Sequence, residues 1–128
     1  MNQYLFRGKT KDTNEWVYGG VAMMGDRYFI VKVQTYDDDT CSWVAVEVYS
    51  ESVGQYTGQT DCNNTYIFEG DIVYVESEGE NAEIRWDLDT SSFVLSFAYW
   101  MCGFDHFGRH GCEVIGNMVD TPHLAWKE

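Results

Sequence analysis

The sequence has no long apolar run, only one proline and few cations. Its longest purely apolar stretch is Phe97–Cys102, far short of the roughly 20 residues that a membrane-spanning helix needs. The amino-terminal residues show no basic region followed by an apolar stretch, so no secretory signal is predicted. We therefore expect a cytoplasmic protein with no membrane partner and with reduced thiols at its 4 cysteines.

Cations are scarce relative to acids: the chain has 8 Lys and Arg residues and 21 Asp and Glu residues, which gives a net charge of −13. Residues 1–32 carry +2, so the remaining 96 residues carry −15. Binding to duplex nucleic acid depends on cations that displace the counterions of the phosphates. This charge argues against nucleic acid as a partner and favours simple solubility.

Two alternatives follow from the same charge distribution. A strongly acidic segment can mimic phosphate charge and occupy the cationic groove of a nucleic-acid-binding protein, as a decoy. The arm that carries Arg7, Lys9 and Lys11 instead keeps a small nucleic-acid-binding barrel in consideration.

Apolar and polar residues alternate with a period of two in several short runs, which indicates β-strands. The clearest runs are residues 28–33, 44–48 and 93–99, and the last one places Phe93, Leu95, Phe97 and Tyr99 on one side. Residues 50–55 have room for a single helical turn, and no amphipathic helix of ten or more residues appears. About eight short strands predict one all-β domain over residues 1–128, either a sandwich or a partly open, SH3-like barrel.

The aromatic residues supply most of the predicted core. Four tryptophans are expected mainly inside it: Trp16, Trp43, Trp86 and Trp100. Trp126 has little chain left to cover it, so we predict that it docks on another subunit. Tyr56, between two glycines, has two interpretations: a tyrosine that caps the core, or a contact residue at a self-association or partner surface.

Two turns in the middle of the chain have a clear physical basis. Residues 61–64, Asp-Cys-Asn-Asn, include residues that tolerate positive φ and precede a predicted strand, which is a hairpin signal. Gly70 permits a tight entry into the next strand. Asp71 is expected to accept hydrogen bonds from nearby backbone amides. The alternative is that Glu69 and Asp71 act as an acid/base pair or bind Mg²⁺.

Residues 53–73, VGQYTGQTDCNNTYIFEGDIV, closely resemble the central signature of the YopX-like family of bacteriophage and prophage proteins. Residues 6–19 and 113–117 are similar to the amino- and carboxy-terminal blocks of that family. Asn64 stands where the family usually has glycine, but asparagine also tolerates a left-handed backbone. The resemblance implies a β-rich fold with a partly open barrel, in a phage or prophage setting inside a bacterial host cell. It implies no catalytic residues.

The strongest chemical cluster contains Cys102, His106, His110 and Cys112. Two thiolates and two imidazoles can complete a tetrahedral zinc site, but this spacing differs from the common zinc fingers. The alternative is a glycine-rich hairpin tip in which Cys102 joins the core. Cys112 beside either histidine is also the one local nucleophile and base pair. We predict no metal site, no cofactor and no catalytic residue.

The leading functional hypothesis is therefore a non-enzymatic accessory protein that acts through protein–protein contacts. Its expected partners are other copies of itself, in a homo-oligomer, and a host or phage protein. Tyr56 and Trp126 are the predicted contact residues.

Overall fold

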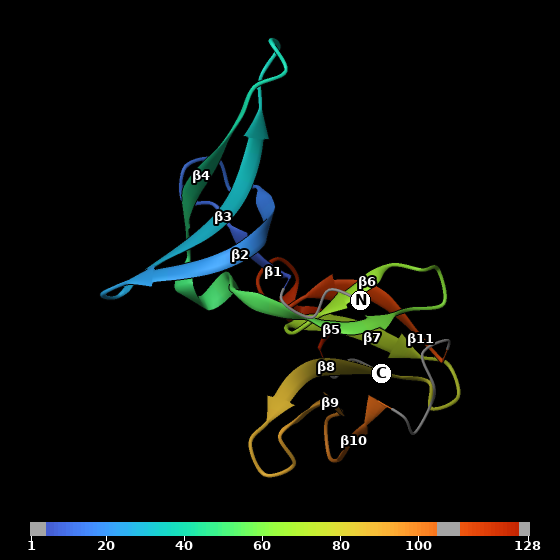
Figure 1. The fold of residues 1–128 in the computed structure, drawn as a ribbon. Coiled ribbons are helices and arrows are strands. Elements are labelled where there is room, and N and C mark those ends of the chain that lie inside the picture. The colour runs from blue at the N-terminus through green and yellow to red at the C-terminus, as the bar shows by residue number, and fades with distance from the viewer. Residues whose placement is uncertain (1–4, 105–110, 126–128) are drawn as a thin grey trace. The chain divides into compact units, whose positions relative to one another are not determined.

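The computed structural model describes residues 5–104 and 111–125, and these residues form antiparallel strands joined by short turns (Figure 1). The strands are β1 (Phe6–Lys9), β2 (Trp16–Met24), β3 (Arg27–Thr35), β4 (Cys41–Val48), β5 (Gly54–Thr60), β6 (Tyr66–Phe68), β7 (Asp71–Val75), β8 (Glu80–Asp87), β9 (Ser92–Ser96), β10 (Met101–Gly103) and β11 (Cys112–Asn117). Short 3-10 turns occupy Ser50–Ser52 and Pro122–Leu124. The predicted all-β class is confirmed.

The strands form two sheets, one ordered β4-β3-β2-β1-β5-β6 and the other β10-β9-β8-β7-β11, and neither is closed into a barrel. The described chain therefore has more strands than the eight predicted. It divides into two compact units, the N-terminal unit (residues 2–55) and the C-terminal unit (residues 56–128), and the division falls inside β5. That the whole chain behaves as one domain stays a prediction.

In the N-terminal unit, the segment after β1 returns to the end of β4. Thr10 forms a bridge with Val48, and the backbone N–H of Lys11 donates to the Glu47 carbonyl at 3.2 Å. Gly8 lies against Val48, where an added Cβ would come within 2.8 Å of the valine Cγ2. Among the described residues of this unit, only two apolar side chains are fully buried, Val48 and Ile30.

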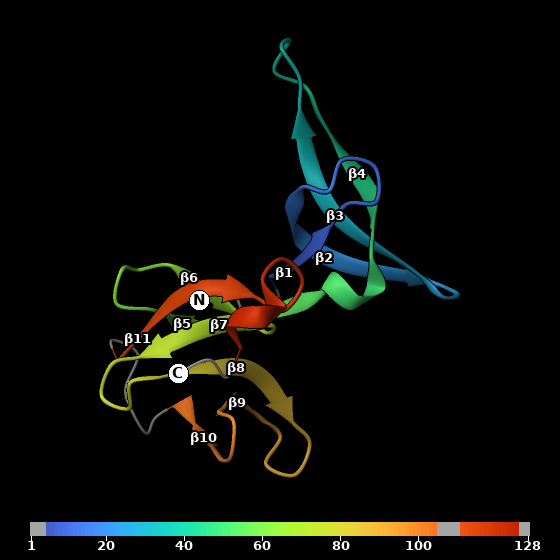
Figure 2. The ribbon, with the colours of Figure 1, turned by 180° about the vertical axis from the view of Figure 1, so that it is seen from behind.

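The C-terminal unit contains the main core. Aliphatic side chains from β6 to β9, with Phe97 and Cys112, form one buried cluster: Ile67, Val73, Val75, Ala82, Ile84, Leu95, Phe97 and Cys112. Figure 2 shows β7 between β8 and β11, so both of its neighbours contribute to this cluster. Close packing of branched side chains across adjacent strands is the source of its stability.

One predicted strand is too long. β9 ends at Ser96, and the Phe97 N–H donates to the Trp100 carbonyl at 2.7 Å, which closes a turn. Phe97 is buried, but Tyr99 lies in the turn and is 93% exposed. The alternating pattern continues past the point where the chain reverses, so Tyr99 is not part of the inward stripe.

The prediction that tryptophans mainly fill the core is wrong for the described residues. Trp43 is 74% exposed, Trp86 and Trp100 are exposed to 42% and 38%, and Trp16 is half-buried. The core is filled instead mainly by branched aliphatic side chains, which pack well against their neighbours on a pleated sheet. Trp126 lies outside the described residues.

Candidate functional site

The turn between β5 and β6 is organised by Asp61, whose side chain is 1% exposed. Its Oδ1 accepts hydrogen bonds from the backbone N–H groups of Asn63 and Thr65, at 2.8 and 2.9 Å. Its Oδ2 accepts from the N–H of Val114 on β11, at 2.8 Å. Asn64 has a φ of 63°, which confirms the predicted left-handed turn position. One carboxylate thus shapes the hairpin and attaches it to β11.

The surroundings of Asp61 keep this carboxylate ionised. Burial alone would raise its pKa, but hydrogen bonds from the backbone N–H groups of Val114, Thr65 and Asn63 outweigh burial and lower the pKa. A buried carboxylate that accepts three backbone hydrogen bonds has little capacity left to bind a ligand. Sequence reasoning missed this role, although aspartate at the start of a turn is a known signal for such hydrogen bonds.

Asp71 shapes the second turn in the way predicted. Its side chain is 2% exposed, and its Oδ2 accepts the backbone N–H of Phe68 at 2.8 Å. Gly70 between the two acids has a φ of 92°, which favours glycine, whereas Glu69 is half-buried. In the described part of the chain, no three His, Cys, Asp or Glu side chains are placed to hold a metal ion.

An open pocket of about 620 Å³ lies beside the Asp61 turn. Its lining residues are Cys62, Tyr74, Glu76, Ser77, Gly111, Cys112 and Glu113. The N–H of Cys62 donates to the carbonyl of Cys112 at 3.0 Å, so the two cysteines lie next to each other. The pocket therefore combines two thiols with acidic side chains.

The electrostatics of this pocket disfavour thiolates. Burial raises the pKa of the Cys112 thiol to about 11, with smaller contributions from Asp61 and Cys62. The pKa of Cys62 is raised by partial burial and then by the negative charges of Asp61 and Glu113. A reactive cysteine needs cationic neighbours that lower its pKa, so this arrangement works against thiol catalysis.

Of the Cys/His cluster that the sequence analysis weighed as an alternative zinc site, the structure describes the two cysteines. Cys112 is in the core of the C-terminal unit, and Cys102 on β10 packs against that core. His106 and His110 lie outside the described residues. Cys112 is buried and Cys102 is half-buried, so both contribute to the core as small hydrophobic residues do. The absence of a metal site stays a prediction.

Of the two predicted contact residues, one is described. Tyr56 is 6% exposed, and its ring stacks on Tyr66 with centroids 4.4 Å apart. The Phe68 ring lies 5.7 Å away. The partner seen for Tyr56 is thus another ring of its own unit, and its contact with a second protein stays a prediction. Trp126 lies outside the described residues.

A different group of apolar side chains is exposed on the N-terminal unit. In the register of β3 and β4, Val33 is opposite Trp43 and Val31 is opposite Ala45. Val33 and Trp43 are 48% and 74% exposed. Together with Tyr18 and Met24 on β2, these residues lie on one side of the sheet, because residues directly opposite share a face. We call six apolar side chains of this side the apolar face: Tyr18, Met24, Val31, Val33, Trp43 and Ala45. The same side also carries the Arg27–Glu47 ion pair, with Arg27 directly opposite Met24.

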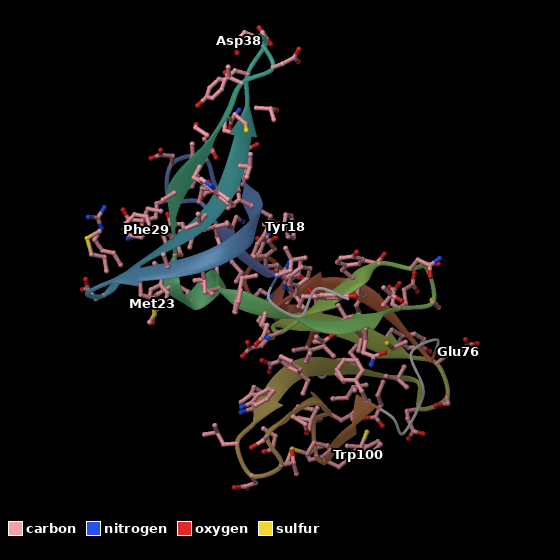
Figure 3. The ribbon with its side chains drawn as sticks, viewed as in Figure 1. Tyr18, Met23, Phe29, Asp38, Glu76 and Trp100 are labelled. Carbon is pink, nitrogen blue, oxygen red and sulfur yellow. The ribbon has the colours of Figure 1, made fainter. Side chains whose placement is uncertain are left out.

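The sequence contains a signal for this face. Val44, Val46 and Val48 alternate with Trp43 along β4, so the tryptophan must point away from the valines. Val48 and Ile30 are the buried members on the valine side. Figure 3 shows Tyr18 and Phe29 on the ribbon of this unit, with Asp38 at the tip of the turn between β3 and β4.

An ion-pair cluster lies at the end of β4. The Glu47 carboxylate accepts from Arg27 at 2.9 Å and from Lys11 at 3.1 Å. These two hydrogen bonds lower the pKa of Glu47 to about 2. Lys11, which the sequence suggested as part of a nucleic-acid-binding arm, is therefore already engaged with an acidic partner in the structure.

The fold and these side chains define a class: a small all-β protein whose two buried aspartates, Asp61 and Asp71, shape turns in its C-terminal unit. In the described residues, no helix is long and apolar enough to cross a membrane. The chain belongs to the YopX family, because the family model described as YopX protein matches residues 5–125. No curated protein matches the chain.

Proposed function

We propose that this YopX-family protein acts by protein–protein contact rather than by catalysis, as an accessory protein in the phage or prophage setting that the family resemblance implies. The observation that carries the proposal is the apolar face of the N-terminal unit. Trp43, the one tryptophan of this face, is 74% exposed. Contiguous exposed apolar side chains mark interaction surfaces, and tryptophan is enriched among the residues that dominate binding energy.

The chemistry of the other candidate residues supports the same proposal. Asp61 and Asp71 are buried and accept backbone hydrogen bonds, and the Cys112 thiol has a raised pKa. General acids, bases and nucleophiles need accessible groups whose pKa values are tuned toward the working pH. The acidic decoy and the nucleic-acid-binding barrel stay as alternatives.

A matched pair of surface variants tests this proposal. Trp43→Ser removes the largest side chain of the apolar face, whereas Leu88→Ser removes a side chain of the C-terminal unit that is 83% exposed. Association of each full-length protein is measured by sedimentation velocity, and captured host and phage proteins are compared by mass spectrometry. We expect Trp43→Ser to lose contacts that the wild type and Leu88→Ser both keep.

Two outcomes would contradict the proposal. Either the wild type is a monomer that captures nothing specific, or Trp43→Ser keeps every contact that the wild type makes. Circular dichroism of both variants verifies that they are folded, so a loss of contact is attributable to the surface.

A further inference from the structure

The outer edge of β4 has backbone groups available for pairing. β4 is the terminal strand of its sheet. The Glu47 carbonyl accepts the Lys11 N–H, and the Tyr49 N–H donates to the Lys9 carbonyl at 3.0 Å, so residues 47 and 49 direct their backbone groups to the outer edge. Because these directions alternate along an antiparallel strand, Cys41, Trp43 and Ala45 also direct their N–H and C=O groups outward.

Residues 9–11 cover the far end of this edge, at residues 47–49, but residues 41–46 have none of the usual protections against pairing. Residues 41–46, Cys-Ser-Trp-Val-Ala-Val, contain no proline and no charged side chain, and the register with β3 is continuous from Tyr28↔Val48 to Thr35↔Cys41, with no bulge. Natural proteins protect edge strands with lysine, proline or bulges, since an open edge is a template for another strand. Residues 41–46 can therefore pair with an extended segment along their outer edge.

We propose that the segment is β4 of a second copy of this chain, paired antiparallel about a two-fold axis at Trp43. This inference rests on the proposed function and specifies one of its partners. In this register Trp43 is opposite the partner's Trp43, and Cys41 is opposite the partner's Ala45. Every outward N–H and C=O group of these residues then finds a partner, so the edge is complementary to itself.

The charges at the two ends of β4 favour a second copy in this orientation. The turn before β4 carries Asp37, Asp38 and Asp39, and the far end of the strand lies beside Lys9. Antiparallel pairing places the acidic turn of each copy at the end of β4 that lies beside Lys9 of the other. It also keeps the two acidic turns at opposite ends, so that they do not repel each other.

The apolar face becomes continuous across the axis in this dimer. Trp43 already lies opposite Val33 within one copy, so the order across the dimer is Val33, Trp43, Trp43 and Val33. Directly opposed aromatic residues on one face of a sheet stabilise strand pairing. Trp43, which is 74% exposed, thus gains the identical side chain of the second copy as a neighbour.

Disulfide trapping tests the register directly. Ala45→Cys is made in a full-length Cys62→Ser parent, which leaves Cys41 as the exposed native thiol among the described cysteines. Opposite residues of a hydrogen-bonded pair have Cα atoms about 5.5 Å apart, within the disulfide range. Cys41 and position 45 of one strand are about 13 Å apart, so only an intermolecular bond can form.

We expect mild oxidation to convert most of the Ala45→Cys protein into a covalent dimer. The Cys62→Ser parent, and the same protein with Ala22→Cys on β2, should give at most one-tenth as much dimer. Adding Cys41→Ser to the Ala45→Cys protein should return the yield to that of the parent. Position 22 is an exposed residue of the sheet away from the β4 edge, so it reports random collision.

The results separate this inference from the proposed function. A wild type that dimerises in solution while Ala45→Cys gives no more covalent dimer than Ala22→Cys means that another surface forms the dimer. A monomeric wild type whose Trp43-dependent capture of other proteins persists means that a different protein occupies the edge. Either result overturns the second-copy proposal and leaves contact through the apolar face standing.

A variant at the axis gives a second readout. Trp43→Lys places two like charges opposite each other, which is the protection that natural edge strands use. We expect its dimer dissociation constant to rise at least tenfold. An unchanged dissociation constant for a folded Trp43→Lys protein would overturn the proposal.

Discussion

The two units of this protein distribute their apolar side chains in opposite ways. The C-terminal unit buries an aliphatic cluster around Val73 and Ile84, whereas the described N-terminal unit fully buries only two apolar side chains and exposes Trp43 and Val33. Apolar burial is the main source of folding stability, and exposed apolar area is the usual mark of a binding surface. Similar strand patterns therefore build a buried core in one unit and leave apolar side chains exposed in the other.

Asp61 in the C-terminal unit should give the largest effect on stability. Asp61→Ala removes the acceptor of three backbone hydrogen bonds, and we expect the free energy of unfolding to fall by about 4 kcal/mol. Asp89→Ala, at an exposed turn position, should change it by less than about 0.5 kcal/mol. Urea unfolding followed by circular dichroism measures both. Equal effects of the two substitutions would contradict a structural role for Asp61.

A pair of truncations compares the two units directly. Ile84 is 0% exposed in the C-terminal core and Val33 is 48% exposed on the apolar face. Ile84→Ala should lower the free energy of unfolding by about 3 kcal/mol, and Val33→Ala by less than about 0.5 kcal/mol at concentrations where the protein is monomeric. A large loss from Val33→Ala in the monomer would mean that the apolar face is part of a core.

Adjacent glycines in β2 test how closely the N-terminal sheet packs. A Cβ at Gly19 would collide with the carbonyl oxygen of Val31, whereas one at Gly20 meets nothing within 4 Å. We expect Gly19→Ala to lower the free energy of unfolding by about 2 kcal/mol. Gly20→Ala should stay within about 0.5 kcal/mol of the wild type. Thermal unfolding of both proteins compares them, and equal midpoints would show that the sheet relaxes around either methyl group.

Glu47 should give the smallest effect, visible as a pH dependence. Its pKa is lowered from 4.5 to about 2 by hydrogen bonds from Arg27 and Lys11. A carboxyl group with a lowered folded-state pKa adds stability above its unfolded pKa, and that stability is lost as the pH falls from about 4.5 toward 2. Stability measured from pH 7 to pH 2 should therefore fall less steeply in Glu47→Gln. Parallel curves for the two proteins would contradict this ion-pair cluster.

Much of the fold is predictable from the sequence because strands show a local alternation of apolar and polar residues. The alternation at residues 28–33 and 44–48 predicts β3 and β4, and the glycine and asparagine positions predict both central turns. The backbone hydrogen bond to Asp71 is also predictable, since aspartate side chains at turns commonly accept hydrogen bonds from nearby backbone N–H groups.

Other features depend on contacts between distant segments. Alternation defines two faces of a strand but not which one is covered, so it does not reveal that Trp43 is exposed and Ile30 is buried. The hydrogen bond from Val114 to Asp61 joins residues 53 positions apart in the chain, a separation at which local sequence carries no signal. The edge position of β4 follows from the sheet order and therefore needs the tertiary structure.

Residue-resolved amide hydrogen exchange at several protein concentrations tests most directly whether the outer edge of β4 in the N-terminal unit pairs with another strand. The outward N–H groups of Trp43 and Ala45 should exchange rapidly in dilute protein and at least tenfold more slowly in concentrated protein. The N–H groups of Val44 and Val73, which are paired within the chain, should be protected at every concentration. Exchange of Trp43 and Ala45 that is independent of concentration and unchanged in Trp43→Lys would contradict the account.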